Sequence, residues 1–86
     1  MRNLERLFKA LANRRRLVIM QYLKAHRQVT VGDIAAFLRL SISATSRHLS
    51  LLASAELVES EQRSLQVYYR LSVSRPKLIR AVDTIC

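Results

Sequence analysis

The spacing of apolar residues changes once along this chain, near residue 56, and that change most constrains the fold. Before it, in residues 4–11 and in later segments, apolar side chains recur three and four positions apart, which is typical of helices that bury one face. After it, Val67 and Tyr69 alternate with Tyr68 and Arg70, as a half-buried hairpin requires. The pattern therefore predicts a mostly α protein with one β-hairpin.

The predicted elements form one domain over residues 1–86, because a chain of 86 residues has room for one core. A single glycine and a single proline argue against an all-β fold with many tight turns. Helices are expected over 3–12, 14–25, 31–39, 42–55 and 76–85, with strands over 57–61 and 65–71 around a turn near Gln62, Arg63 and Ser64. Expected N-caps are Asn3, Asn13, Thr30 (in a capping box with Asp33) and Ser41. The inward faces of the second and fourth helices should carry Leu17, Met20 and Leu23, and Thr45, Leu49 and Leu52, respectively. The third, short helix carries the apolar residues Ile34, Phe37 and Leu38.

The charge balance narrows the class of partner. Lys and Arg number 15 against 6 Asp and Glu, which gives a formal net charge of +9. Such a chain favours a polyanion, with nucleic acid first and an anionic membrane second. No apolar run approaches the roughly 18 residues of a membrane span, and residues 1–16 lack the apolar stretch of a secretory signal. The single cysteine, Cys86, forbids a disulfide within the chain and favours a reducing compartment, the cytoplasm.

The helix expected over 42–55 carries an unusual second face of small polar groups and one arginine. Its members are Ser43, Ser46, Arg47, Ser50 and Ser54. A solvated helix face more often carries Lys and Glu, which have better helix propensity than serine. Small side chains would let a helix approach the bases of a DNA major groove, which is only about 12 Å wide. This face is either that of a recognition helix or that of a serine-rich surface helix.

The order helix, helix, helix–turn–helix, β-hairpin, helix predicts a winged helix–turn–helix fold. Three stretches also carry a family resemblance: Leu7-Phe8-Lys9-Ala10-Leu11-Ala12-Asn13 with Arg16-Leu17; Leu40-Ser41, Ser43 and Ser46-Arg47-His48-Leu49 with Leu52; and Leu57-Val58 with Val67-Tyr68-Tyr69-Arg70-Leu71. Together they resemble the ArsR/SmtB repressors over nearly the whole chain. The resemblance implies a dimeric DNA-binding repressor that an inducer releases from its operator.

The resemblance also implies roles for individual residues. Recognition-helix contacts to DNA would come from Ile42, Ser43, Ser46, Arg47, His48 and Ser50. An apolar Ile42 could contact a thymine methyl but cannot hydrogen-bond a base. The dimer interface, formed by the first and last helices, would contain Leu4, Leu7, Phe8 and Leu11 together with Leu78, Ile79, Val82 and Ile85.

Several of these positions keep two interpretations. His48 either reaches a phosphate or base or has a structural role, which its place beside the inward row favours. Arg63, at the expected wing tip, either contacts the minor groove or a phosphate or is a solvated turn arginine. Arg14 and Arg15, at a helix N-terminus, either bind DNA phosphate or belong to a solvated basic turn.

The sequence departs from the family in its sensor motifs and in its wing. Many relatives carry Cys-Val-Cys-Asp at the third helix, whereas residues 29–33 here contain no thiol and Asp33 is explained by capping. The last expected helix has Asp83 but no histidine, so we expect no metal and no cofactor, and the inducer is not identified. Glu59 and Glu61 stand where the family has basic residues, and Ser64 stands where glycine would accept a positive φ.

The function expected from these observations is sequence-specific repression of transcription by a homodimer on a pseudo-palindromic operator in double-stranded DNA. The alternative is a winged-helix module that binds a protein partner, or nucleic acid without sequence specificity, which the acidic wing strand supports. An enzyme is not expected, because the sequence shows no nucleophile–base pair, glycine-rich phosphate loop or ligand cluster.

Overall fold

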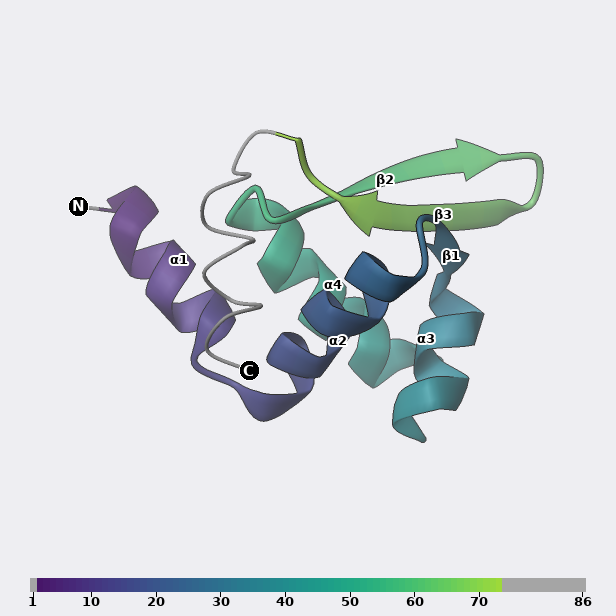
Figure 1. Ribbon diagram of the computed structural model, residues 1–86, viewed down its shortest axis with the longest axis horizontal. Helices are drawn as coiled ribbons and strands as arrows, with labels where there is room; N and C mark the ends of the chain where they lie inside the picture. Colours follow the sequence, from purple (N-terminus) through teal and green to yellow (C-terminus); the bar gives the residue numbers. More distant parts are fainter. Residues whose placement is uncertain (1, 74–86) are drawn as a thin grey trace.

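The computed structural model describes residues 2–73, with side chains from Leu4 onward. The elements are α1 (Arg2–Leu11), α2 (Arg14–Ala25), β1 (Val29–Thr30), α3 (Val31–Leu38), α4 (Ile42–Ser54), β2 (Val58–Arg63) and β3 (Gln66–Leu71). The four helices nearly coincide with the ranges expected from the sequence, and the helix expected over 76–85 lies outside the described residues. The β2–β3 hairpin projects beyond the helices at the end of the molecule opposite α1 (Figure 1).

Helices α2, α3 and α4 each begin at a side-chain cap that the sequence predicts, whereas α1 begins at Arg2, before the expected cap Asn3. Asn13 Oδ1 accepts a hydrogen bond from the backbone N–H of Arg16 at 3.1 Å. Thr30 and Asp33 form a reciprocal capping box at the start of α3, with distances of 3.1 and 3.2 Å. Ser41 Oγ accepts from the backbone N–H of Ala44 at 3.0 Å at the start of α4. These bonds satisfy backbone donors that a helix leaves unpaired in its first turn.

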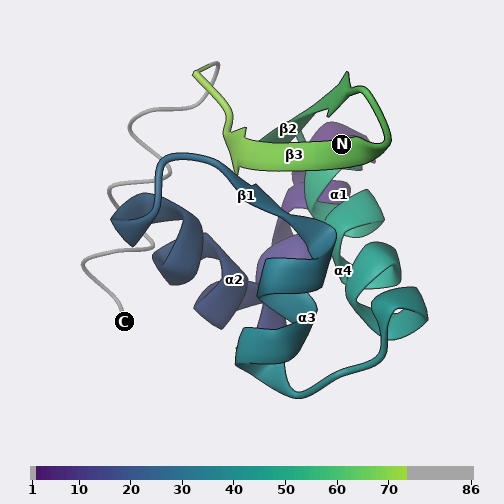
Figure 2. The ribbon, with the colours of Figure 1, turned by 90° about the vertical axis from the view of Figure 1, so that its right-hand side faces the viewer.

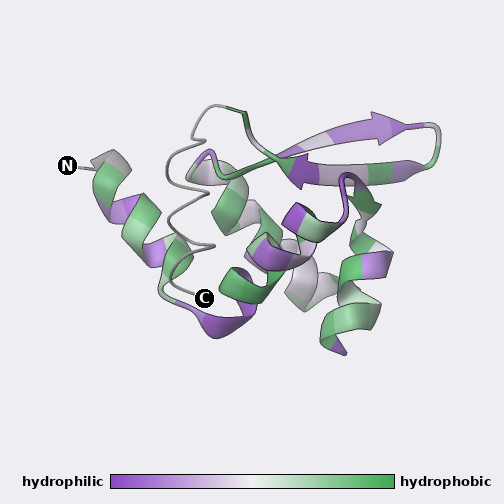
Figure 3. Cartoon of the chain, viewed as in Figure 1, coloured by the Kyte–Doolittle hydropathy of each residue, from purple (hydrophilic) through white to green (hydrophobic). Residues whose placement is uncertain are grey.

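The core is built from residues of α1, α2, α3 and α4 and from the base of the hairpin. Figure 3 shows hydrophobic stretches on these helices and at the base of the hairpin. The largest fully buried side chains of the core are Ile19, Met20, Leu23, Ile34, Leu49, Leu52, Leu57 and Thr45. Thr45 is tolerated there because its hydroxyl donates to the Ser41 carbonyl at 2.9 Å. The inward positions expected for α4 are confirmed.

Of the three apolar residues that the sequence places on α3, Phe37 is the one that lies outside the core. Phe37 is 56% exposed, and its ring lies against Tyr22 of α2 with the centroids 4.4 Å apart. Ala35 is buried in its place beside Ile34. A helix of eight residues offers little room for a large ring where it packs between α2 and α4, so the small side chain takes the inner position.

A third strand, which the sequence did not predict, completes the sheet in the order β1-β3-β2. Val29 pairs with Tyr69 and Thr30 with Tyr68, both antiparallel. A two-residue strand is too short to show a period, and its pairing partner lies far away in sequence. Since α3 begins directly after Thr30, this pairing joins the helix–turn–helix to the hairpin (Figure 2).

The hairpin turn lies further along the chain than the sequence suggests. Arg63 is the last residue of β2 and pairs with Gln66, so the turn consists of Ser64 and Leu65. Ser64 has a φ of 56°, the left-handed conformation that two-residue hairpin turns demand of one or both residues. The register therefore places Leu65, rather than Arg63, at the tip of the wing.

Candidate nucleic-acid interface

Helix α4 has one buried face and one exposed face of small polar groups. Thr45, Leu49 and Leu52 are buried on the inner side. On the outer side Ser43, Arg47, Ser50 and Ser54 are exposed, and Ser46 is half-buried. Ile42, the first residue of the helix, is 52% exposed. The outer face therefore offers hydroxyls, one guanidinium and one apolar group on a helix that the core holds in place.

Arg16 connects the start of α2 to the end of α1 and to α4. Its Nε donates to the Ala10 carbonyl at 2.7 Å, and its Nη2 donates to the Lys9 carbonyl at 2.9 Å. Its Nη1 lies 3.2 Å from Nδ1 of His48. Because a guanidinium only donates hydrogen bonds, Nδ1 must accept, and Nε2 then carries the proton of the neutral ring. Sequence reasoning missed this link, because the two residues are 32 positions apart.

The environment of His48 disfavours its charged form. Partial burial, followed by the positive charges of Arg16, Arg15 and Arg47, lowers the pKa of this imidazole below its ordinary value of 6.5. A neutral ring held by Arg16 supports the structural interpretation of His48, although the Nε2–H remains available as a donor.

The acidic residues of the wing are paired with arginines inside the sheet. Glu59 accepts from Arg70 Nε at 3.1 Å, and Glu61 accepts from Arg70 Nη1 at 3.1 Å. Glu61 also pairs with Arg63 at 3.0 Å, and these arginines lower the pKa of the Glu61 carboxyl. The guanidinium of Arg63 further lies 5.3 Å from the ring centre of Tyr68. Arg63 therefore serves the sheet as an ion-pair and cation–π partner.

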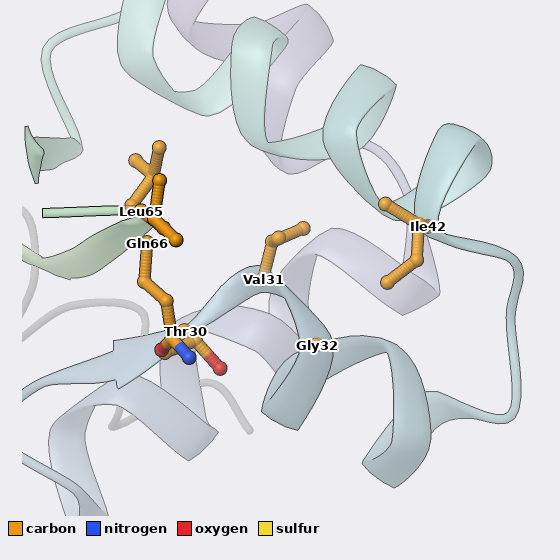
Figure 4. Close-up of a pocket in the computed structure, with 7 residues that line it drawn as sticks. Thr30, Val31, Gly32, Ile42, Leu65 and Gln66 are labelled. Atoms are coloured by element: carbon orange, nitrogen blue, oxygen red, sulfur yellow. The ribbon is translucent and has the colours of Figure 1, made fainter.

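A hollow of about 320 Å³ separates the start of α4 from the tip of the wing. Its lining contains Thr30, Val31, Gly32, Ile42, Leu65, Gln66 and Val67. Val31, at the start of α3, lies between Leu65 on one side and Ile42 on the other (Figure 4). The starts of both helices of the helix–turn–helix and the wing tip thus share one surface.

The other predicted site residues fall into two groups. Arg14 and Arg15 are exposed at the start of α2, and Arg15 is near enough to His48 to lower its pKa. On α1, Leu4 and Phe8 are exposed, while Leu11 is half-buried against the core. Leu7 is only 7% exposed and packs in the chain's own core, and its place in a dimer interface stays a prediction. The remaining interface candidates, Leu78, Ile79, Val82 and Ile85, lie outside the described residues.

The part of the chain over residues 2–73 holds no group of three or more His, Cys, Asp or Glu side chains arranged to bind a metal ion. Within the same residues, no helix has the length and apolar character needed to cross a membrane.

The sequence is similar to a known domain family and to characterised transcriptional regulators. A family model described as a helix-turn-helix domain matches residues 11–61. The transcriptional activator HlyU of Vibrio cholerae is 39% identical over 71 residues, which cover 83% of this chain and 65% of HlyU. The arsenical resistance operon repressor of Bacillus subtilis is 35% identical over 72 residues, which cover 84% of this chain and 69% of the repressor.

The fold is also similar to solved structures of regulators of this kind. A homodimeric winged helix-turn-helix DNA-binding domain from Mycobacterium bovis, described as a possible ArsR-family regulator, has a TM-score of 0.85 and 32% identity, with 96% of this chain and 77% of that one covered. HlyU of Vibrio cholerae has a TM-score of 0.82 and 32% identity, with 96% and 87% covered. Both the predicted winged-helix fold and the predicted family are confirmed. The chain belongs to the ArsR/SmtB family of winged helix–turn–helix transcriptional regulators.

Proposed function

We propose that this protein is a transcriptional repressor that binds a pseudo-palindromic operator as a homodimer. The observation that carries the proposal is the outer face of α4, where exposed serines and Arg47 stand on a helix whose other face is buried. A buried inner face fixes the helix, and small outer side chains allow it to enter a major groove closely. The net charge of +9 supplies the attraction to duplex DNA.

The roles within this face follow from the chemistry of each group. Arg47 can donate two parallel hydrogen bonds to a guanine, and Ile42 can contact a thymine methyl. Ser43, Ser46 and Ser50 can donate to or accept from base edges or phosphates. Arg14 and Arg15 supply phosphate contacts beside α4, where the positive end of α2 adds to their charge.

The homodimer is proposed from the Mycobacterium bovis relative and from exposed apolar side chains on α1. Leu4 and Phe8 are spaced one helical turn apart, and both project from the body of the chain. A two-fold dimer places its recognition helices on half-sites about 34–36 Å apart, so the operator should be symmetric. The inducer is proposed to be other than a metal ion bound by the usual family motifs, since residues 29–33 lack thiols.

In-vitro selection from a random duplex pool, at near-physiological salt, tests the proposal directly. Recovery of a two-fold-symmetric site supports it, whereas recovery of no preferred sequence overturns it and favours the partner-binding alternative. On the selected site, Arg47→Ala should weaken binding by about 5–150-fold and relax the preference at one base pair per half-site. Arg27→Ala is the matched control, because it removes an equal charge from an exposed residue between α2 and β1.

The phosphate role of Arg14 and Arg15 needs its own measurement. Replacing both with alanine should reduce the slope of log affinity against log salt by about 0.9 for each lost phosphate contact. An unchanged slope would assign the two residues to a solvated basic turn.

A further inference from the structure

We propose that Leu65 enters the DNA minor groove beside each half-site, and that the wing therefore recognises DNA by shape and apolar contact rather than by charge. This inference rests on the proposed function, and it identifies the wing residue that makes the contact. It replaces Arg63, which the sequence placed at the wing tip.

The first observation is the position of Leu65. It is 96% exposed, the highest value among the large apolar side chains that the structure describes. It occupies the second position of a two-residue turn, and the pairing of Arg63 with Gln66 holds the backbone on both sides of that turn. The side chain thus contributes almost nothing to the core, yet paired strand residues flank its turn on both sides.

The second observation is that the hairpin carries no net charge. Between Val58 and Leu71 the charged residues are Glu59, Glu61, Arg63 and Arg70, two of each sign. Both arginines are hydrogen-bonded to glutamates, with Arg63 Nε 3.0 Å from Glu61 and Arg70 Nε 3.1 Å from Glu59. A DNA contact by Arg63 would have to break this pairing or bring Glu61 toward the phosphates. The net charge of +9 therefore lies outside the hairpin, and the neutral wing is poorly suited to bind the DNA phosphates by charge.

The third observation is the placement of Leu65 relative to α4. Leu65 and Ile42 line the same hollow of about 320 Å³, at the wing tip and the start of α4 (Figure 4). With α4 in a major groove, we expect the tip on the far side of this hollow to lie beyond the intervening backbone, at the adjacent minor groove. Proteins commonly place leucine and other apolar side chains in minor grooves, where they contact sugars and base steps. A guanine amino group would obstruct a leucine there, so the flanks should prefer A·T pairs.

The test uses the full chain and the duplex recovered by selection. Leu65→Ala should lower affinity for this duplex about tenfold, equivalent to about 1.4 kcal/mol, without changing the salt slope. The control Glu61→Gln/Arg63→Gln keeps the hairpin neutral while removing the arginine, and its affinity should stay within about twofold of wild type. Thermal unfolding checks that both variants remain folded, which the exposure of all three side chains favours.

A modified duplex then identifies the groove. Replacing flanking adenines with 2,6-diaminopurine adds an amino group to the minor groove and leaves the major-groove edge unchanged. The wild-type protein should bind the modified duplex more weakly, and Leu65→Ala should bind both duplexes equally. Equal sensitivity of the two proteins, or an unaltered affinity of Leu65→Ala, would overturn the proposal. If selection recovers no symmetric site at all, the proposed function fails first, so the two failures are distinguishable.

Discussion

Replacing Arg16 with alanine should destabilise the fold far more than its partial exposure suggests. The change removes three hydrogen bonds, to the carbonyls of Ala10 and Lys9 and to His48, at 2.7, 2.9 and 3.2 Å. A hydrogen bond from a charged donor contributes about 1.5–3 kcal/mol, and these three are discounted because they share one donor group near the surface. We therefore expect a loss of about 2–3 kcal/mol, out of the roughly 4–13 kcal/mol typical of a chain this long. The melting temperature should fall by roughly 10–20 °C.

The assay is thermal and denaturant unfolding at fixed protein concentration, because the stability of the proposed homodimer would depend on concentration. Arg14→Ala is the matched control: it removes the same charge two positions away, where the side chain is exposed. We expect that control to stay within about 0.5 kcal/mol of wild type. If Arg16→Ala melts within a few degrees of Arg14→Ala, the three contacts do not hold α1 and α4 against α2, and the reasoning is wrong.

Three further predictions concern His48, the wing turn and the cap of α4. Because the folded protein holds the pKa of His48 below 6.5, the unfolded chain binds the proton first on acidification, so stability should fall as pH drops through about 6.5. His48→Asn keeps an acceptor for Arg16 and removes the titration. It should therefore reduce the change in unfolding free energy that wild type shows between pH 7.5 and pH 5.5. Ser64→Gly relieves a φ of 56° and should raise stability by about 0.5–1 kcal/mol in denaturant unfolding, whereas a lower midpoint would contradict the strain. Ser41→Ala removes the cap bond to Ala44 and should cost about 1 kcal/mol in the same assay, which Ser41→Asp should largely restore.

The features that the sequence predicted well are local ones. Ser41 and the Thr30–Asp33 box act on donors within three residues, so side-chain type and spacing were enough to place them. The buried side of α4 was likewise visible in its period. Its outer face of serines, the main part of the candidate site, follows from the same period by geometry.

The features that the sequence missed depend on contacts between distant segments. The pairing of β1 with β3 joins residues about forty positions apart and leaves no periodic mark in two residues. The link from Arg16 to His48 is invisible for the same reason. The turn was misplaced because the pairing of Arg63 with Gln66, rather than local turn propensity, decides which residues are unpaired. Because of that register, Leu65 rather than Arg63 lies at the wing tip.

The short strand β1 has a consequence for the length of the DNA site. Its two residues pair with β3 of the wing and run directly into α3, which packs against α4, so β1 links the position of the wing to that of the helix–turn–helix. An inserted base pair displaces the next groove by about 3.4 Å along the DNA axis. The wing cannot shift by that distance relative to α3 without breaking the backbone hydrogen bonds between β1 and β3. We therefore expect binding to tolerate a change of base identity between the helix and wing contacts far better than a change in the number of base pairs that separates them.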